Sequence, residues 1–260
     1  MNTKYAILIL SSDKYRDLWV PFFELFWKNW PSCPFNVYLG SNSHAFYHKR
    51  VKNILTGKDI NWSTSYKKIL KQIPEKYIFV LLEDSIITSK IDTALFIKCF
   101  NFAESNEINH LNFTSLPSSA ITSKNPKFIP VKRFIPYRVH VIGFWKKDYL
   151  YDLLLEGENP WSFEIMGSYR SSYDDGFYST KYPIYSSIHL VKKNKWIQNG
   201  LQYCKDNAIG IDISKRKSLS MFEQLLYNLH EYYFKFIYFH FDWKIRVGFM
   251  NILRRALLSY

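Results

Sequence analysis

Residues 77–88 read YIFVLLEDSIIT, and this stretch decides the fold. Its first six residues form a continuous apolar run, which is typical of a strand buried on both faces of a parallel sheet. Glu83 and Asp84 end the run abruptly, and because unpaired ionised carboxylates are costly to bury, we expect them where the strand leaves the core. Ligands of open α/β sheets bind outside the carboxyl ends of the strands. The stretch therefore predicts either a site for a divalent metal or a phosphorylated ligand, or two solvated acids at a strand end.

The chain before this stretch alternates strand and helix patterns. Buried strands are expected at residues 5–10 and 35–39, and apolar residues at helical spacing predict helices over 17–30 and 62–73. Asn61 or Ser63 is expected to cap the second helix. The order strand, helix, strand, linker, helix, strand indicates a parallel α/β sheet with right-handed crossovers. The sequence has neither GxGxxG nor GxxxxGK[ST], which disfavours dinucleotide and P-loop sites.

The rest of the chain continues the α/β pattern and ends in a different kind of segment. Helices are expected at residues 92–104 and 148–156, and strands at 110–113, 137–144 and 184–188. Residues 115–130 are rich in Ser, Pro, Asn and Lys, which is typical of a loop. We expect residues 1–210 to form one catalytic domain with a mixed, mostly parallel sheet flanked by helices, and residues 211–260 to form a C-terminal helical appendage.

Composition limits the partners and the compartment. The chain has 260 residues, of which 47% are hydrophobic and 22% charged, as in globular proteins, and a net charge of +13. Such a charge attracts nucleic acid, anionic lipid or phosphorylated substrates. Cys33, Cys99 and Cys204 are scattered, so we expect no disulfide framework and a reducing cytosol. No signal peptide or transmembrane helix is predicted.

Four short clusters carry side chains able to bind a ligand or move a proton. They are Ser11, Ser12 and Asp13 after the first strand; Glu83 and Asp84; Glu164 within NPWSFEIMGS at 159–168; and His189, Lys192, Lys193 and Lys195 within SSIHLVKKNKW at 186–196. Two of these clusters suggest specific chemistry, and each has an ordinary structural alternative.

Glu164 is the first of these. It lies just past Trp161 and Phe163, and desolvation beside aromatic rings raises the pKa of a carboxyl, which suits a general base acting on a sugar hydroxyl. Trp161 itself is a candidate to stack against a sugar face. The alternative is a first helical turn whose glutamate complements the helix dipole.

The cluster around His189 is the second. A neutral imidazole is a good metal ligand, and the three lysines suit a diphosphate leaving group. The alternative is a solvated basic loop with a structural histidine.

The order of these features resembles the GT-A class of glycosyltransferases, and more closely the bacterial enzymes of capsule, lipopolysaccharide and O-antigen gene clusters. The matching stretches are ILILSSDKYRDLWVPFFELFWKNWP, WSTSYKKILKQIPEKYIFVLLEDSIIT, YRVHVIGFWKKDYLYDLLLEGENPWSFEIMGS and IYSSIHLVKKNKW, which together cover about residues 4–200. The resemblance implies a nucleotide-sugar donor, here guessed as a UDP-sugar, lying over the first strands. It also implies an acidic motif that holds Mn²⁺ or Mg²⁺ against the diphosphate.

The resemblance assigns a role to each cluster. It implies nucleotide contacts for Ser11, Ser12, Asp13, Asn42, Trp62 and Ser63, with Glu83 in the acidic motif. It implies that Asp84 lies nearest the metal and sugar, that Glu164 is the catalytic base of an inverting enzyme, and that His189 completes the metal shell.

The motif departs from the family pattern in one respect. It reads Leu-Glu-Asp-Ser instead of Asp-x-Asp, which leaves metal dependence open, because Lys192, Lys193 and Lys195 can hold a diphosphate without a metal. Asp174 and Asp175 are rival carboxylates, or else part of a turn before Gly176.

The C-terminal segment differs from the rest. Residues 215–260 hold eight basic and three acidic residues, a net charge of +5, and residues 232–243 include eight aromatics. Residues 247–258 repeat apolar side chains at helical spacing. This combination predicts a helix in a membrane interface, where each Lys or Arg near an anionic leaflet contributes roughly 1 kcal/mol. The alternative is an aromatic helix packed on the catalytic domain.

These observations together predict a peripheral glycosyltransferase. It would move a hexose-type sugar to a hydroxyl of a lipid-linked surface polysaccharide or lipopolysaccharide, at the cytoplasmic face of an inner membrane. A retaining outcome stays open, and no nucleic acid partner is expected. Two alternatives remain: a basic nucleic-acid-binding protein, favoured by the charge and the aromatic residues, and a non-catalytic membrane scaffold.

Overall fold

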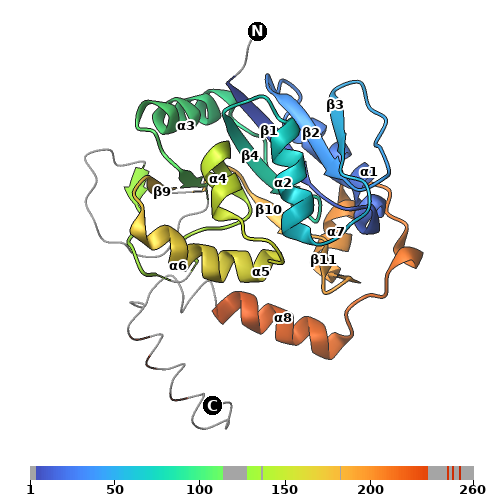
Figure 1. The fold of residues 1–260 in the computed structure, drawn as a ribbon. Helices are drawn as coiled ribbons and strands as arrows, with labels where there is room; N and C mark the ends of the chain where they lie inside the picture. The colour runs from blue at the N-terminus through green and yellow to red at the C-terminus, as the bar shows by residue number, and fades with distance from the viewer. Residues whose placement is uncertain are drawn as a thin grey trace.

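A mixed eight-stranded sheet organises the molecule (Figure 1). The computed structural model describes residues 4–113, 128–135, 137–181 and 183–233, and the single positions 245, 248 and 252. The strand order is β3-β2-β1-β4-β8-β6-β9-β7, and helices cover both faces of the sheet. The predicted α/β class, with a mixed and mostly parallel sheet, is confirmed.

Four parallel strands form the first half of the sheet. These are β1 (Tyr5–Leu10), β2 (Asn36–Ser41), β3 (Val51–Leu55) and β4 (Tyr77–Leu82). Leu10 of β1 is paired with both Gly40 of β2 and Leu82 of β4, so the three carboxyl ends lie at one edge. The order 3-2-1-4 is that of a nucleotide-binding half-sheet. β3 was not predicted, because as an edge strand it keeps only two of its five residues buried.

The second half of the sheet is mixed. β8 (Gly143–Lys146) runs antiparallel to β4 and to β6 (His110–Asn112). β9 (Phe177–Thr180) is parallel to β6 and antiparallel to β7 (Phe128–Pro130). Two small ladders lie outside the sheet: β5 (Ser85–Ile87) with β10 (Ser187–His189), and β11 (Val191–Lys192) with β12 (Lys195–Trp196).

The sheet separates two apolar clusters, which explains the continuous apolar run of β4. Phe79 and Leu81 pack in the cluster with side chains of α1 (Trp19–Asn29) and α3 (Thr93–Ser105). Ile78 and Val80 pack in the cluster with α2 (Trp62–Gln72) and α4 (Lys147–Leu153). The side chain of Asn61 accepts from Thr64 N at the start of α2, so Asn61 is the cap. The helices predicted at 17–30, 62–73, 92–104 and 148–156 are confirmed with small changes of bounds.

The predicted strand at 137–144 is wrong over most of its length, since the ladder begins only at Gly143. The backbone N–H groups of Val139 and Val141 donate instead to side chains of Ser168 and Glu164. Each buried backbone donor needs a partner, and these two find it on a helix rather than on a strand. The predicted strand at 184–188 likewise forms only from Ser187. Within the predicted loop at 115–130, residues 115–127 lie outside the described residues, and β7 forms its last three residues.

One continuous helical stretch spans residues 160–173, which we call the 160–173 helix (Figure 1). It consists of α5 (Pro160–Ser162), η2 (Phe163–Gly167), α6 (Ser168–Arg170) and η3 (Ser171–Tyr173). The remaining helices are η1 (Asp13–Leu18), α7 (Gln198–Asp206), η4 (Ile213–Lys215) and α8 (Met221–Tyr233).

The start of the C-terminal segment is joined to the α/β unit. The Arg216 guanidinium is buried, donates to both carboxylate oxygens of Asp17 at 2.6 and 2.8 Å, and lies 4.7 Å from the Tyr15 ring. Beyond residue 233 only positions 245, 248 and 252 are described, so the predicted aromatic and amphipathic helix is not tested. No helix in the described ranges has the length and apolar character needed to cross a bilayer.

Candidate active site

A cleft of about 540 Å³ lies at the carboxyl ends of β1 and β4. It brings together members of all four clusters found in the sequence. The predicted residues that line it are Ser11, Ser12, Trp62, Glu83, Asp84, Glu164, His189, Lys192 and Lys193, together with Trp161. Asp13, Asn42, Ser63 and Lys195 do not line it. Segments that are more than a hundred residues apart in the chain therefore line the same cleft.

Asp84 and His189 meet because β5 and β10 pair. His189 is opposite Ser85 in this ladder, and Leu190 N donates to the backbone oxygen of Asp84 at 2.8 Å. His189 Nδ1 then lies 3.8 Å from Asp84 Oδ1. That carboxylate oxygen is buried and has no hydrogen-bond partner within the described part of the chain. An unsatisfied carboxylate oxygen beside an imidazole nitrogen fits a divalent cation.

The described residues hold no group of three histidine, cysteine, aspartate or glutamate side chains able to bind a metal. Asp84 and His189 are thus two protein ligands at most within these ranges, and a bound metal would need oxygen atoms of the ligand to fill its shell. Two ligands plus a diphosphate are a chemically reasonable donor set for Mn²⁺ or Mg²⁺.

Glu83 has a different environment from its neighbour. Its side chain is almost fully buried at the end of β4. Burial, followed by the charge of Asp84, raises the pKa of Glu83 well above its ordinary value, although the Ser11 hydroxyl opposes the shift. Glu83 therefore holds its proton more tightly than an ordinary glutamate does.

Glu164 enters the cleft from the start of the 160–173 helix. Asn159 caps this helix by accepting from Ser162 N, and Pro160 stands at the first helical position, which suits its missing N–H. Glu164 Oε1 accepts from Val141 N at 3.0 Å and lies 3.7 Å from His140 Nδ1. The predicted helix start is confirmed.

The expectation of a raised pKa for Glu164 is wrong. Burial is the largest influence on this carboxyl and raises the pKa, but His140 and the Val141 N–H outweigh it and hold the pKa below its ordinary value. Glu164 is therefore ionised, which is the state that a proton acceptor requires. The expectation failed because the sequence pattern did not reveal that His140 and the Val141 N–H lie beside this carboxyl.

The lysines occupy a tight hairpin. Lys193 and Asn194 both have positive φ angles, 49° and 63°, which join β11 to β12 in a two-residue turn. Lys192 and Lys193 are exposed and line the cleft. Lys195 points elsewhere and pairs with Glu223 of α8 at 2.5 Å. Two of the three predicted lysines are thus available for a diphosphate.

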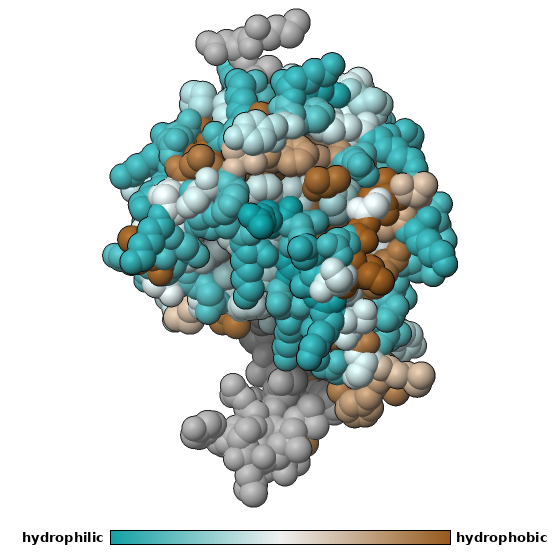
Figure 2. Space-filling view, turned by 90° about the vertical axis from the view of Figure 1, so that its right-hand side faces the viewer, coloured by the Kyte–Doolittle hydropathy of each residue, from teal (hydrophilic) through white to brown (hydrophobic). Residues whose placement is uncertain are grey.

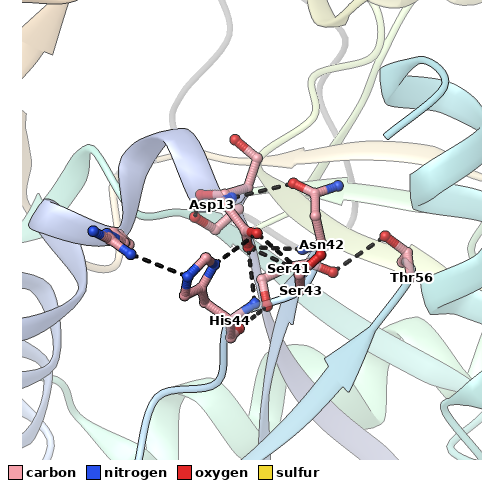
Figure 3. A network of polar contacts seen from close by, with 9 residues as sticks. Asp13, Ser41, Asn42, Ser43, His44 and Thr56 are labelled. Carbon is pink, nitrogen blue, oxygen red and sulfur yellow. Dashed lines mark hydrogen bonds and ion pairs between the residues drawn. The ribbon is translucent and has the colours of Figure 1, made fainter. Parts of the chain in front are cut away.

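Asp13 and Asn42 belong to a separate network between the ends of β1 and β2, with Asp13 facing His44 (Figure 3). Asp13 Oδ1 accepts from the backbone N–H groups of Asn42, Ser43 and His44 at 3.1 to 3.2 Å. Asn42 Oδ1 in turn accepts from Asp13 N. Burial raises the pKa of Asp13, but these bonds and the one from His44 outweigh it and lower the pKa. The network joins the two strand ends.

The remaining predicted residues also have partners in the protein. Ser63 is buried and its hydroxyl donates to Asn61 Oδ1. Asp174 accepts from the Tyr149 hydroxyl at 2.7 Å, and Asp175 pairs with Arg133 at 2.6 Å. Neither aspartate lines the cleft.

Sequence reasoning missed several residues that line the cleft. These are Tyr15, Asn112, His140, Tyr185 and Tyr227. His140 was hidden inside an apparent strand pattern, and Tyr227 lies on α8, in the segment predicted to leave the catalytic domain. For Tyr15, the only indication in the sequence was its position just after the cluster of Ser11, Ser12 and Asp13.

Comparison with known proteins gives remote likeness only. No family model and no curated protein matches the sequence. The chain is similar to residues 1–349 of S. aureus TarS in complex with UDP-GlcNAc, with 11% identity and a TM-score of 0.46, over 90% of this chain and 73% of that one. It is also similar to a cytidylyltransferase from Leptospira borgpetersenii, with 14% identity and a TM-score of 0.45, over 85% of this chain and 99% of that one.

A third similar structure is the galactosyltransferase LgtC in complex with donor and acceptor sugar analogs. It shares 7% identity and a TM-score of 0.40, over 66% of this chain and 71% of that one. The chain spans 36% of the length of the longer S. aureus TarS structure. Identities and scores this low leave the function to be argued from the cleft itself.

Proposed function

We propose that the protein is a glycosyltransferase that moves a sugar from a nucleotide-diphosphate donor, such as a UDP-sugar, to an acceptor hydroxyl with inversion. The observation that carries the proposal is the composition of the cleft. The cleft holds a partly buried, ionised carboxylate, Glu164, together with Asp84, His189 and two exposed lysines, Lys192 and Lys193. This pairing of a base with an anion-binding cluster suits group transfer from a phosphate ester.

Each side chain has a defined task in this reaction. Glu164 takes the proton of the acceptor hydroxyl, whose oxygen forms the new bond to the anomeric carbon. The bond from that carbon to the diphosphate oxygen breaks, and its electron pair leaves with the diphosphate. Lys192 and Lys193 stabilise the charge that develops on this leaving group. His140 and the Val141 N–H keep Glu164 ionised and oriented.

A metal has a place in this scheme. Asp84 and His189 would hold Mn²⁺ or Mg²⁺, which when bound supplies positive charge beside the diphosphate. Glu83, a buried carboxyl whose pKa is raised, would complete the acidic motif beside Asp84. The implied nucleotide contacts of Ser11, Ser12 and Trp62 are supported by their position in the cleft wall. Asp13, Asn42, Ser63 and Lys195 would act indirectly, through the elements that they hold.

The acceptor we propose is a lipid-linked surface polysaccharide or lipopolysaccharide at the cytoplasmic face of the inner membrane. The basic and aromatic composition of residues 211–260 supports attachment to an anionic bilayer. The catalytic unit of residues 1–210 and this segment would work together, because Tyr227 of α8 lines the cleft.

A ligand screen followed by a product assay tests the proposal. Thermal shift is measured with nucleoside diphosphates and nucleotide sugars, each with Mn²⁺, Mg²⁺ or EDTA. A ligand at 100 times its Kd adds about 2.7 kcal/mol of stability, which is readily detected. A shift with one nucleotide series, and release of that nucleoside diphosphate on addition of an acceptor, would support the transferase. Shifts with DNA or RNA alone would contradict it.

A further inference from the structure

Two helices beside the cleft are inverted relative to ordinary surface helices. A surface helix normally turns an apolar stripe toward the core and a polar face toward solvent. Apart from Phe163, the side chains that the 160–173 helix buries are polar: Ser168, Ser171 and Ser172. Its outward side carries large apolar side chains, each more than half exposed: Trp161, Ile165, Met166, Tyr169 and Tyr173. Four of these five follow one another at intervals of four residues, so they form one stripe.

α8 shows the same inversion. Its contacts with the α/β unit are polar: Glu223 pairs with Lys195, and Gln224 Oε1 accepts from Gln198 N at 3.1 Å. Tyr227, one turn further along, lines the cleft. The other side of α8 carries apolar residues that are each about half exposed or more, namely Met221, Phe222, Leu225, Leu226, Leu229 and Tyr232.

The two stripes flank the mouth of the same cleft. Trp161 at the start of one helix and Tyr227 within the other are both lining residues. Figure 1 shows α8 beneath α5 and α6. In Figure 2, which keeps the same vertical axis, brown and tan side chains gather at the lower edge of a mostly hydrophilic face, at the height of α8. Exposed apolar surface of this extent marks an interaction site.

We propose that these two stripes form one bilayer-docking face, which sets the cleft mouth against an anionic membrane surface. The charge around the mouth selects this partner. Lys192 and Lys193 are exposed on the cleft rim, and Lys215 and Lys217 are exposed just before α8. Lysines beside aromatic and aliphatic side chains match a bilayer interface, where phosphate headgroups lie next to acyl chains.

If the proposed function holds, the docking face allows the acceptor to remain anchored in the bilayer during transfer. An acceptor with a sugar head and an apolar anchor can keep its anchor in the bilayer while its head reaches the cleft, past Trp161 and Tyr227. Membrane contact is therefore bipartite. The 160–173 helix belongs to the α/β unit, so docking does not depend on the C-terminal segment alone.

Vesicle binding of the full-length protein tests the face without any need for catalysis. Sedimentation is measured with vesicles of phosphatidylcholine and phosphatidylglycerol, and with phosphatidylcholine alone. One variant combines Ile165→Ser with Tyr169→Ser, and a second combines Phe222→Ser with Leu226→Ser. The matched control combines Tyr47→Ser with Ile97→Ser, which are exposed on other elements and do not line the cleft.

Each stripe variant should lower the vesicle partition coefficient at least about tenfold, because it removes two large apolar side chains from the interface. The control should bind as the wild type does. All three should keep the wild-type melting temperature, since exposed substitutions change stability little.

Other results would overturn the inference. If the wild-type protein does not sediment with anionic vesicles, the bilayer is excluded as the partner. Wild-type binding by the Ile165 and Tyr169 variant excludes the 160–173 helix from the face. A dimer in solution that the stripe variants dissociate assigns the face to a second copy. If vesicle binding responds as expected but no sugar transfer is found with a soluble acceptor, the docking face stands and the proposed function fails.

Discussion

Two neighbouring places at the carboxyl edge of the parallel half-sheet hold similar polar residues in opposite states. At the ends of β1 and β2, Asp13 has its oxygens filled by three backbone N–H groups and His44. At the end of β4, one oxygen of Asp84 is buried without a hydrogen-bond partner in the described ranges. The pKa of Asp13 is lowered, whereas that of Glu83 is raised.

The difference separates two uses of a carboxylate. A carboxylate that the chain itself satisfies stabilises the fold, because its charge is compensated before any ligand arrives. Carboxylates whose charge or lone pairs are left uncompensated lower stability and are retained for a ligand or a reaction. Substitutions in the Asp13 network should therefore lower stability, whereas substitutions of the cleft carboxylates should mainly change activity.

The largest effect is expected for Glu164→Gln. The amide keeps the shape and can still accept from Val141 N, but it cannot take a proton, so kcat should fall about 10²- to 10⁴-fold. The melting temperature should change little. The measurement is the rate of nucleoside diphosphate release with the donor and acceptor found in the screen. Activity within threefold of the wild type would remove Glu164 from the base role.

The sequence predicts those parts of the fold and the site that depend on local patterns, and it misses those that depend on contacts between distant residues. Apolar runs and caps are local, so β1, β4, the start of α2 and the helix start at Pro160 were all found in the sequence. That the polar residues ending those strands serve one ligand was implied by the family resemblance, and ligands do bind at the carboxyl ends of strands in open α/β sheets.

What the sequence could not provide was the pairing of distant polar groups. His140 reaches Glu164 because residues 137–142 bend along a helix instead of forming a strand, and this depends on bonds such as Val139 N to Ser168 Oγ. Tyr227 and Lys195 are similar cases. The ion pair between Lys195 and Glu223 connects the β11–β12 hairpin to α8, and no local sequence pattern predicts such a contact.

The next effect is on stability and concerns Asp13→Asn. The variant has only one oxygen to accept from the donors around it, and an amide carries no charge. We expect the free energy of unfolding at pH 7 to fall by about 1.5–3 kcal/mol, the contribution of hydrogen bonds to a charged group. Urea unfolding measures it.

The pH dependence gives the control for Asp13. Its pKa is lower when folded, so its contribution is present above the unfolded pKa of 3.8 and is lost as the pH falls through the folded value. The difference between wild type and Asp13→Asn should therefore shrink below pH 4. A donor Kd that rises more than tenfold in this variant would return Asp13 to the ligand site that the resemblance implies.

A smaller effect is expected for the hairpin lysines. Lys193→Ala removes one positive charge from the cleft rim without removing a contact that the fold uses, so donor Kd should rise about tenfold, equal to 1.4 kcal/mol. Lys98→Ala, exposed on α3, is the matched control and should leave the Kd unchanged. Calorimetric titration with the nucleoside diphosphate measures both. Equal Kd values for the two variants would mean that the diphosphate lies elsewhere in the cleft.

The smallest effect, and the one with reversed sign, is expected for Glu83→Gln. Burial and the charge of Asp84 oppose ionisation, so the pKa of Glu83 is higher in the folded protein than its ordinary value of 4.5 in the unfolded chain. The unfolded state thus binds fewer protons above that pH, and the stability of the wild type falls as the pH rises. The amide does not titrate, so the melting temperature of the variant should exceed that of the wild type at pH 8 by about 2–4 °C.

The difference in melting temperature between Glu83→Gln and the wild type should close toward pH 4.5. It is measured with EDTA present, so that no cation changes the charge beside Asp84. A variant that is less stable than the wild type at every pH would mean that Glu83 is ionised and satisfied like Asp13, and the contrast between the two strand ends would be lost.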